Sequence, residues 1–158
     1  MKKILTTAGV LLGVCLIVLA VSLLATPKTP ATAESFEALM TEKGFTVSRA
    51  DSVVDEYSFV RNVVLAVSPD GSYQLEFYEF ADSEYAGNFF ASNKELFESA
   101  KVGSSSSAST SLKNFEKYTM TNSGRFYAVA VLDNTGIYVT ADAEYKDAIK
   151  EILKELGY

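Results

Sequence analysis

Apolar and polar positions are arranged differently in two parts of the chain. Residues 4–25 form a run of 22 positions without a charged side chain, whereas the remainder shows short alternating and helical patterns. At about 1.5 Å of rise per residue, a helix of this run extends about 33 Å, enough to cross a hydrocarbon layer about 30 Å thick. Lys2 and Lys3 precede the run, and basic residues favour the cytoplasmic side. The pattern predicts a single-pass anchor at residues 1–25, with a cytoplasmic N-terminus and an extracytoplasmic C-terminal domain.

Two alternatives remain for this N-terminal segment. Ala31-Thr32-Ala33 has the A-x-A form of a signal-peptidase site, and cleavage there would release a secreted protein that starts at Glu34. The apolar run is, however, longer than the usual 7–15 residues of a signal peptide. The Thr/Pro-rich stretch at 26–33 is instead typical of a stiff spacer. Lipidation at Cys15 is disfavoured, because largely apolar residues follow this cysteine.

Residues 34–158 show the pattern of one α+β domain. Strands are predicted at 60–67, 73–77, 115–120, 125–132 and 137–140, and an extended segment starts at Phe45. Turn sequences such as Ser68-Pro69-Asp70-Gly71 join neighbouring strands into hairpins. Helices are predicted around residues 36–40, from Asp82 to about Ala100, and from Asp142 onward. We therefore expect a mainly antiparallel sheet of five or six strands, packed by two or three helices.

Two features refine this expectation. The serine-rich stretch at 101–112 has no periodicity, which predicts a flexible loop; a tolerated insertion is favoured over a glycosylated or partner-binding tip. Ala81-Asp82-Ser83-Glu84-Tyr85 is echoed by Ala141-Asp142-Ala143-Glu144-Tyr145. The echo suggests a duplicated αβββ unit closed by a final helix. Convergence of two helix starts on similar capping residues is the alternative.

Charge and composition narrow the possible partners. Residues 34–158 contain 20 acidic and 11 basic residues, a net charge of −9. Such a domain is repelled by nucleic acid and by anionic lipid headgroups. We interpret the charge mainly as a source of solubility, with attraction of a cationic partner as the lesser interpretation.

The chain has few of the residues and motifs that most often carry out catalysis or bind metals. The chain has no histidine, its one cysteine lies in the apolar run, and it contains neither a glycine-rich phosphate loop nor a G-x-S-x-G motif. These features remove the commonest general base, thiol nucleophiles and most transition-metal sites. The sequence therefore predicts no catalytic, cofactor-binding or metal-binding residues, no cofactor, and a function other than catalysis.

Three groups of residues are candidate sites. Glu76 and Glu79 could serve as an acid–base pair, but their spacing in a strand places them on opposite faces. Asp51, Asp55 and Glu56 lack the D-x-D-x-D-G spacing of a calcium loop. Several aromatic residues could line a binding platform on the sheet, although packing as core is favoured. These residues are Tyr73, Tyr78, Phe80, Tyr127 and Tyr138.

The layout of a basic stub, one long apolar segment, a Thr/Pro spacer and a cysteine-free domain resembles small membrane-anchored envelope proteins of Gram-positive bacteria. The resemblance covers the layout of the whole chain and carries over no functional residue. We expect a non-enzymatic domain, tethered to the membrane, that binds a protein or another envelope component. A small-ligand sensor is the alternative, and a hydrolase that uses carboxylates alone is a remote one.

Overall fold

A computed structural model of the protein describes residues 28–158. The predicted anchor, Cys15 and the beginning of the spacer lie outside the described residues. No helix within residues 28–158 is long and apolar enough to cross a membrane.

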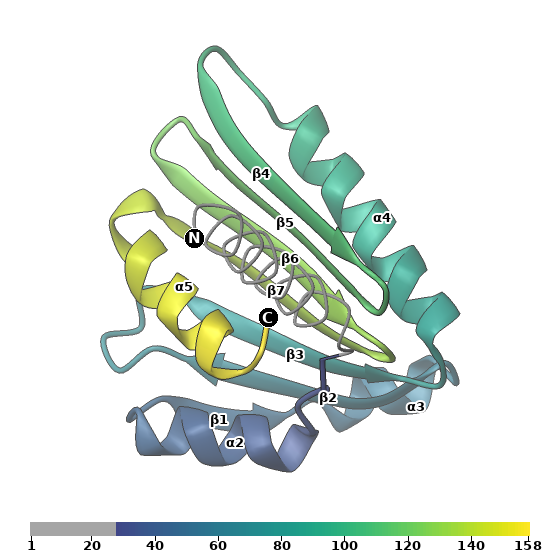
Figure 1. Cartoon of the computed structure of the whole chain (residues 1–158). Helices are drawn as coiled ribbons and strands as arrows, with labels where there is room; N and C mark the ends of the chain where they lie inside the picture. The colour runs from purple at the N-terminus through teal and green to yellow at the C-terminus, as the bar shows by residue number, and fades with distance from the viewer. Residues whose placement is uncertain (1–27) are drawn as a thin grey trace, which may run out of the picture.

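Seven strands form one antiparallel sheet, which confirms the predicted α+β class but exceeds the predicted strand number. The elements are α2 (Ala33–Glu42), β1 (Thr46–Arg49), α3 (Asp51–Glu56), β2 (Val60–Val67), β3 (Gln74–Phe80), α4 (Ser83–Ser99), β4 (Ser105–Leu112), β5 (Phe115–Asn122), β6 (Arg125–Leu132), β7 (Thr135–Asp142), a 3₁₀ turn η1 (Ala143–Tyr145) and α5 (Lys146–Glu155). The strand order is β1-β2-β3-β7-β6-β5-β4. The sheet therefore ends at β1 on one side and at β4 on the other (Figure 1).

Helices cover both faces of the sheet. On one face, called here the α5 face, α2 and α5 pack on side chains such as Phe77 and Ile137. The ring of Phe36 in α2 stacks on Phe77 with centroids 5.1 Å apart. On the opposite face, called here the α4 face, α3 and α4 pack on side chains such as Val129. The strand predicted at 125–132 is β6, which lies between β7 and β5 and is buried on both faces.

The described end of the spacer lies against the domain. The side chain of Asn114 accepts a hydrogen bond from the backbone N–H of Lys28 at 3.3 Å and donates one to its carbonyl at 2.9 Å. The Lys28 ammonium donates to the carbonyl of Gly157 at 2.6 Å and lies 3.9 Å from the centroid of the Phe115 ring. Helix α2 begins at Ala33, after a capping box at Thr32.

The predicted flexible loop at 101–112 is wrong over most of its length. Residues 105–112 form strand β4, which pairs with β5 in unbroken register from Ser105–Asn122 to Leu112–Phe115. The stretch has no alternating pattern because all eight of its residues are exposed, so no face requires apolar side chains. Backbone pairing with β5 holds this strand in the sheet.

The five-residue echo does not mark a structural repeat. The carboxylate of Asp82 caps α4 by accepting from the N–H groups of Glu84 and Tyr85, whereas the Asp142 side chain makes no capping bond. Instead, Asp142 accepts from the Arg125 guanidinium at 3.1 Å. The first stretch leads to α4 and the second to α5, on opposite faces of the sheet. A twofold axis between the antiparallel neighbours β3 and β7 would instead place the two following helices on the same face.

Candidate functional site: the free edge at β4

Strand β4 is the most exposed regular element between residues 28 and 158. All eight of its residues are exposed, and their sequence contains neither a charged residue nor a proline. Edge strands of soluble proteins usually carry such residues, because these prevent pairing with another chain. A long neutral edge is therefore an open template for a further strand.

The register identifies which backbone groups of β4 are free. A two-residue turn closes on a hydrogen-bonded pair, so Leu112 bonds to Phe115, and Asn122 bonds to Arg125. Bonding direction alternates along a strand. The residues of β4 that bond to β5 are Ser106, Ala108, Thr110 and Leu112. The residues whose N–H and C=O groups point to the free edge are Ser105, Ser107, Ser109 and Ser111.

A buried side chain holds the segment that leads into β4. The Asn122 amide donates to the carbonyl of Ala100 at 3.0 Å, and its oxygen accepts from the N–H of Val102 at 3.4 Å. Gly103 follows with a φ of +66°, which lets the chain turn into the strand without steric strain. The hydrogen bonds of Asn122 and the turn at Gly103 therefore fix the point at which β4 begins.

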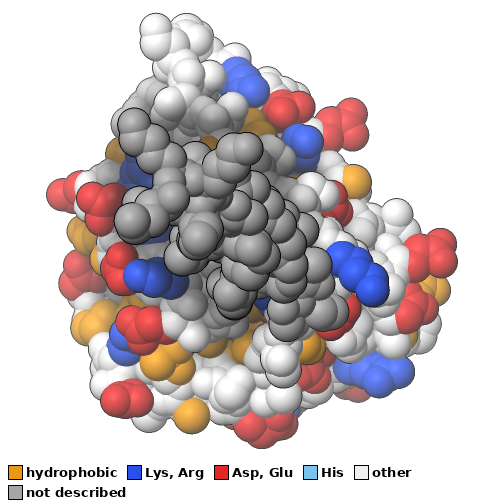
Figure 2. All heavy atoms as spheres, in the orientation of Figure 1, with side chains coloured by type: hydrophobic (Ala, Val, Ile, Leu, Met, Phe, Trp, Pro, Cys, Tyr) orange, Lys and Arg blue, Asp and Glu red, His pale blue; other side chains and the backbone are white. Residues whose placement is uncertain are grey.

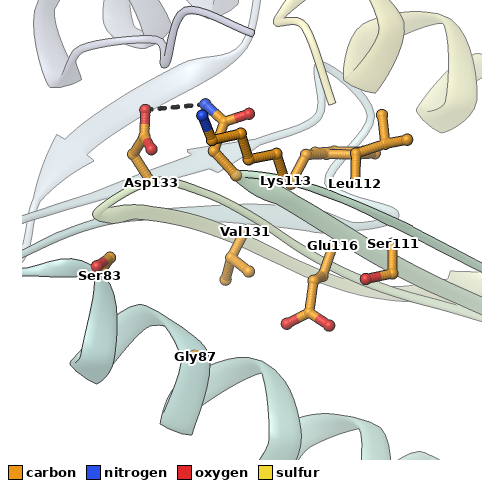
Figure 3. A pocket seen from close by; sticks show the side chains of 10 residues that line it. Ser83, Gly87, Ser111, Leu112, Lys113, Glu116, Val131 and Asp133 are labelled. Carbon is orange, nitrogen blue, oxygen red and sulfur yellow. Dashed lines mark hydrogen bonds between the residues drawn. The ribbon is translucent and has the colours of Figure 1, made fainter. Parts of the chain in front are cut away.

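A hollow of about 240 Å³ lies beside β4 on the α4 face. Figure 3 shows Ser111, Glu116 and Val131 pointing toward α4, where Ser83 and Gly87 leave space. A Cβ at Gly87 would meet no atom within 4 Å. At the rim, the Asn114 amide donates to the Asp133 carboxylate at 3.1 Å (Figure 3).

A second hollow, of about 180 Å³, lies beside β4 on the α5 face. Its lining includes two lysines of α5 and hydroxyls of β4 and β5: Lys146, Lys150, Ser106, Thr119 and Thr121. Burial lowers the pKa of neighbouring Lys117, and the charges of Lys28 and Lys150 lower it further. The α5 face thus carries a local group of positive charges. Acidic side chains, in contrast, are spread around the surface visible in Figure 2.

The two glutamates weighed as an acid–base pair lie on opposite faces of β3, as their spacing indicated. Glu79 accepts hydrogen bonds from the N–H of Ala33 and the amide of Asn62, which tie α2 and β2 to the central sheet. Glu76 accepts from the hydroxyl of Tyr78 on the other face. Glu79 is therefore a structural acceptor rather than one half of a catalytic pair.

The acidic group at Asp51, Asp55 and Glu56 lies within α3 rather than in a loop. Among the residues that the structure describes, no three His, Cys, Asp or Glu side chains are grouped so that they could hold a metal ion.

Most of the aromatic residues that could form a binding platform on the sheet belong to the core. Tyr78 packs on Phe89 of α4 with ring centroids 4.9 Å apart, and Phe97 lies over both Tyr127 and Tyr138. Burial, and then the hydrogen bond to Glu76, raise the pKa of Tyr78 well above its usual value. Phe80 is buried on the same face. Tyr73 instead packs on the α5 face, 5.1 Å from the ring of Tyr145.

The sequence did not predict one exposed aromatic cluster. Tyr57, Phe59 and Tyr85 are each between 37% and 42% exposed. Phe59 stacks on Tyr85 with centroids 5.1 Å apart and touches Tyr57 at 5.6 Å. Tyr85 lies in the first turn of α4, where its side chain is 41% exposed.

Comparison with known proteins found no matching family model, no similar curated protein and no similar solved structure.

Proposed function

We propose that residues 34–158 form a non-enzymatic domain that binds a protein or another envelope component through the β4 edge. A transmembrane anchor at residues 1–25 would hold this domain on the extracytoplasmic side of the membrane. The observation that carries the proposal is the exposure of β4 along its whole length, without charge or proline. An edge of this kind can add a strand from another polypeptide through main-chain hydrogen bonds.

Two further observations support a binding role. The hollows beside β4, of about 240 and 180 Å³, are smaller than the roughly 300–1,000 Å³ of typical small-molecule pockets. The chain contains no histidine, and the two glutamates considered for acid–base chemistry are separated by the sheet. Both observations favour a surface that contacts a macromolecule.

A photo-crosslinking residue in the full-length protein tests this function. Placed at Ser107, on the free edge, it should form a crosslink to a specific partner in native cells. The matched control is the same residue at Thr46, on the opposite edge of the sheet, which should give none. Equal products from both positions, or none from Ser107, would contradict the proposal.

The membrane location has its own test. The full-length mass should remain with membranes after carbonate washing, and external protease should digest the domain in protoplasts. A soluble form that starts at Glu34 would instead show that the segment is a cleaved signal peptide.

Binding of a small molecule in the hollow on the α4 face is the second candidate. It is favoured by Gly87, which leaves space in the helix that forms one wall. Thermal stabilisation of the protein by a small-molecule extract, lost in Gly87→Leu but kept in Ser109→Pro, would favour this function over strand binding.

A further inference from the structure

We propose that β4 accepts an extended strand of a partner protein, and that an acidic side chain of this strand enters the hollow lined by Lys146 and Lys150. This inference rests on the proposed binding function and adds the class of partner. The four outward-facing serines of β4 would supply the main-chain hydrogen bonds, and the hollow would select the side chain.

A strand added to β4 would place its side chains on both faces of the sheet. A new strand lies about 4.8 Å from its neighbour, and its side chains alternate between the two faces. Side chains on the α5 face would project beside Ser106 and Ala108, which line the lysine hollow. Side chains on the other face would project beside Ser111, which lines the hollow at Gly87. Main-chain bonds with pockets for alternate side chains are the general pattern of such recognition.

The charge of the hollow specifies an acidic side chain. Lys146 and Lys150 both line it, together with hydroxyl groups that can donate hydrogen bonds. None of the salt bridges between described residues includes either lysine. A carboxylate placed there would gain charge-assisted hydrogen bonds, whereas a basic side chain would be repelled.

A second copy of this chain fits the edge less well. The β4 segment of another copy would present only serine, threonine, alanine and leucine side chains, none of which could pair with the lysines. Each domain also carries a net charge of −9, so two copies repel one another. Small side chains bury little area, whereas stable interfaces bury about 1,200 Å² or more.

The test begins with a library of random twelve-residue peptides, selected on the full-length protein in detergent micelles. We expect enriched peptides to be rich in β-branched and aromatic residues and to share an acidic residue. The best peptide is then synthesised, and its affinity is measured by fluorescence polarisation for the unchanged protein and for the variants below.

Ser109→Pro tests the strand. It removes one outward N–H, a position where proline is tolerated in an edge strand, and it should weaken peptide binding about tenfold. Ser109→Ala keeps the N–H and should bind within about twofold of the unchanged protein, which is below 0.5 kcal/mol. Ser107→Pro is an independent second variant. Slow hydrogen exchange at Ala108 and Thr110, which bond to β5, shows that β4 remains folded in both proline variants.

Lys146→Gln and Lys150→Gln test the hollow. Together they should weaken binding of the acidic peptide about tenfold, while a peptide with glutamine in place of its acidic residue should no longer distinguish the variants. Lys154→Gln, in the same helix but outside the hollow, is the matched control and should have no effect.

Four results would overturn the inference. One is binding that Ser107→Pro and Ser109→Pro both leave intact, and another is enrichment of peptides without a common acidic residue. The third is a dimer that Ser109→Pro abolishes, which would identify a second copy as the occupant. The last is lysine-dependent binding to phosphatidylglycerol vesicles without peptide binding, which would identify a lipid site. If the Ser107 crosslink still captures a protein in these cases, the proposed function stands and only this inference fails.

Discussion

The two edges of the sheet are built in opposite ways. Strand β1 has four residues and ends at Arg49, whose guanidinium bonds to Glu37 of α2 at 2.7 Å and to Glu34 at 3.4 Å. Strand β4 has eight residues, and none of the salt bridges between described residues involves it. One edge is short and charged, whereas the other is long and neutral.

This difference shows how the domain controls strand pairing. Short length and fixed charges make an edge a poor partner for another strand, because a docking strand would have to displace the ion pairs. The β1 edge has both features, and β4 has neither. Side chains around β4 are also small, so a docking strand would meet little steric resistance. We infer that the domain keeps only the β4 edge available for a partner.

The largest expected effect comes from truncating a buried side chain of α2, the helix that packs on the sheet near β1. Phe36 of α2 is fully buried against Phe77. Phe36→Ala should lower the free energy of unfolding by about 3–5 kcal/mol, because it leaves a cavity at this contact. Urea unfolding followed by circular dichroism measures the change. Leu96→Ala in α4 is the control at a site that is 58% exposed, and it should change stability by about 0.5 kcal/mol or less.

The next effect concerns the segment that leads into β4. Asn122→Ala should lower the free energy of unfolding by about 1–3 kcal/mol, because the carbonyl of Ala100 and the N–H of Val102 lose their buried partner. Hydrogen exchange should quicken in β4 before it does in β1. Asn93→Ala, which removes only a bond within α4, should leave β4 unchanged. Equal loss of protection in both edges would contradict a separate role for Asn122.

A smaller, stabilising effect is expected in α4 beside the open edge. Gly87→Ala should raise the free energy of unfolding by about 0.5–1 kcal/mol, because alanine favours a helix and its Cβ meets no atom. Thermal unfolding measures the gain. Gly136→Ala is the opposing control: its Cβ would lie 3.0 Å from the Phe89 ring and 3.2 Å from the Phe80 ring, so it should destabilise.

Weakening the charged edge should cost little stability. Glu37→Gln removes the closest ion pair of Arg49 and should lower the free energy of unfolding by about 0.2–1 kcal/mol, less at high salt. Glu42→Gln, also in α2, is the control. The sharper readout is strand association at β1, measured with β4 blocked by Ser109→Pro. In that background, Glu37→Gln combined with Arg49→Ser should restore binding of the peptide that has glutamine in place of its acidic residue, since β1 has no lysine hollow. Unchanged binding would show that the short length of β1, rather than its charge, prevents pairing with another strand.

The smallest effect is a pH dependence of the β2–β3 turn. Hydroxyls of Ser72 and Ser68 donate to the Asp70 carboxylate and lower its pKa from 3.8 to about 2. A carboxyl with a lowered pKa in the folded state stabilises that state above its unfolded pKa. This contribution is therefore lost as the pH falls from about 4 to 2. Asp70→Asn should therefore flatten the pH dependence of the thermal midpoint in this range.

Much of the sheet was predictable from the sequence because hairpins are indicated by turn residues and by short alternating segments beside them. The turn at Ser68–Gly71 and the strand predicted at 73–77 identified the β2–β3 hairpin, and the strands predicted at 115–120 and 125–132 correspond to β5 and β6. The sequence did not predict α3, a helix of six residues without a full apolar stripe. It also did not predict β4, because a strand exposed on both faces has no hydrophobic period to detect.

The candidate site was not predicted, for a related reason. Its residues are serines, two lysines of α5 and a glycine of α4, none of which has a distinctive spacing along the chain. The aromatic residues that could form a binding platform, Tyr78, Tyr127 and Tyr138 among them, instead pack beneath α4. The aromatic cluster at Tyr57, Phe59 and Tyr85 forms only because the end of α3 meets the start of α4.

The sequence by itself determined the α+β class, most hairpins, the acidic charge and the short inventory of reactive groups, because these depend on local patterns and on composition. Only the tertiary structure decided which strands lie at the edges, which face each helix covers, and which backbone groups remain free. Such properties depend on pairing between distant segments: β7 lies between β3 and β6, so the sheet ends at β1 and β4. A neutral serine-rich stretch becomes an open strand only because β5 holds one of its sides and nothing described holds the other.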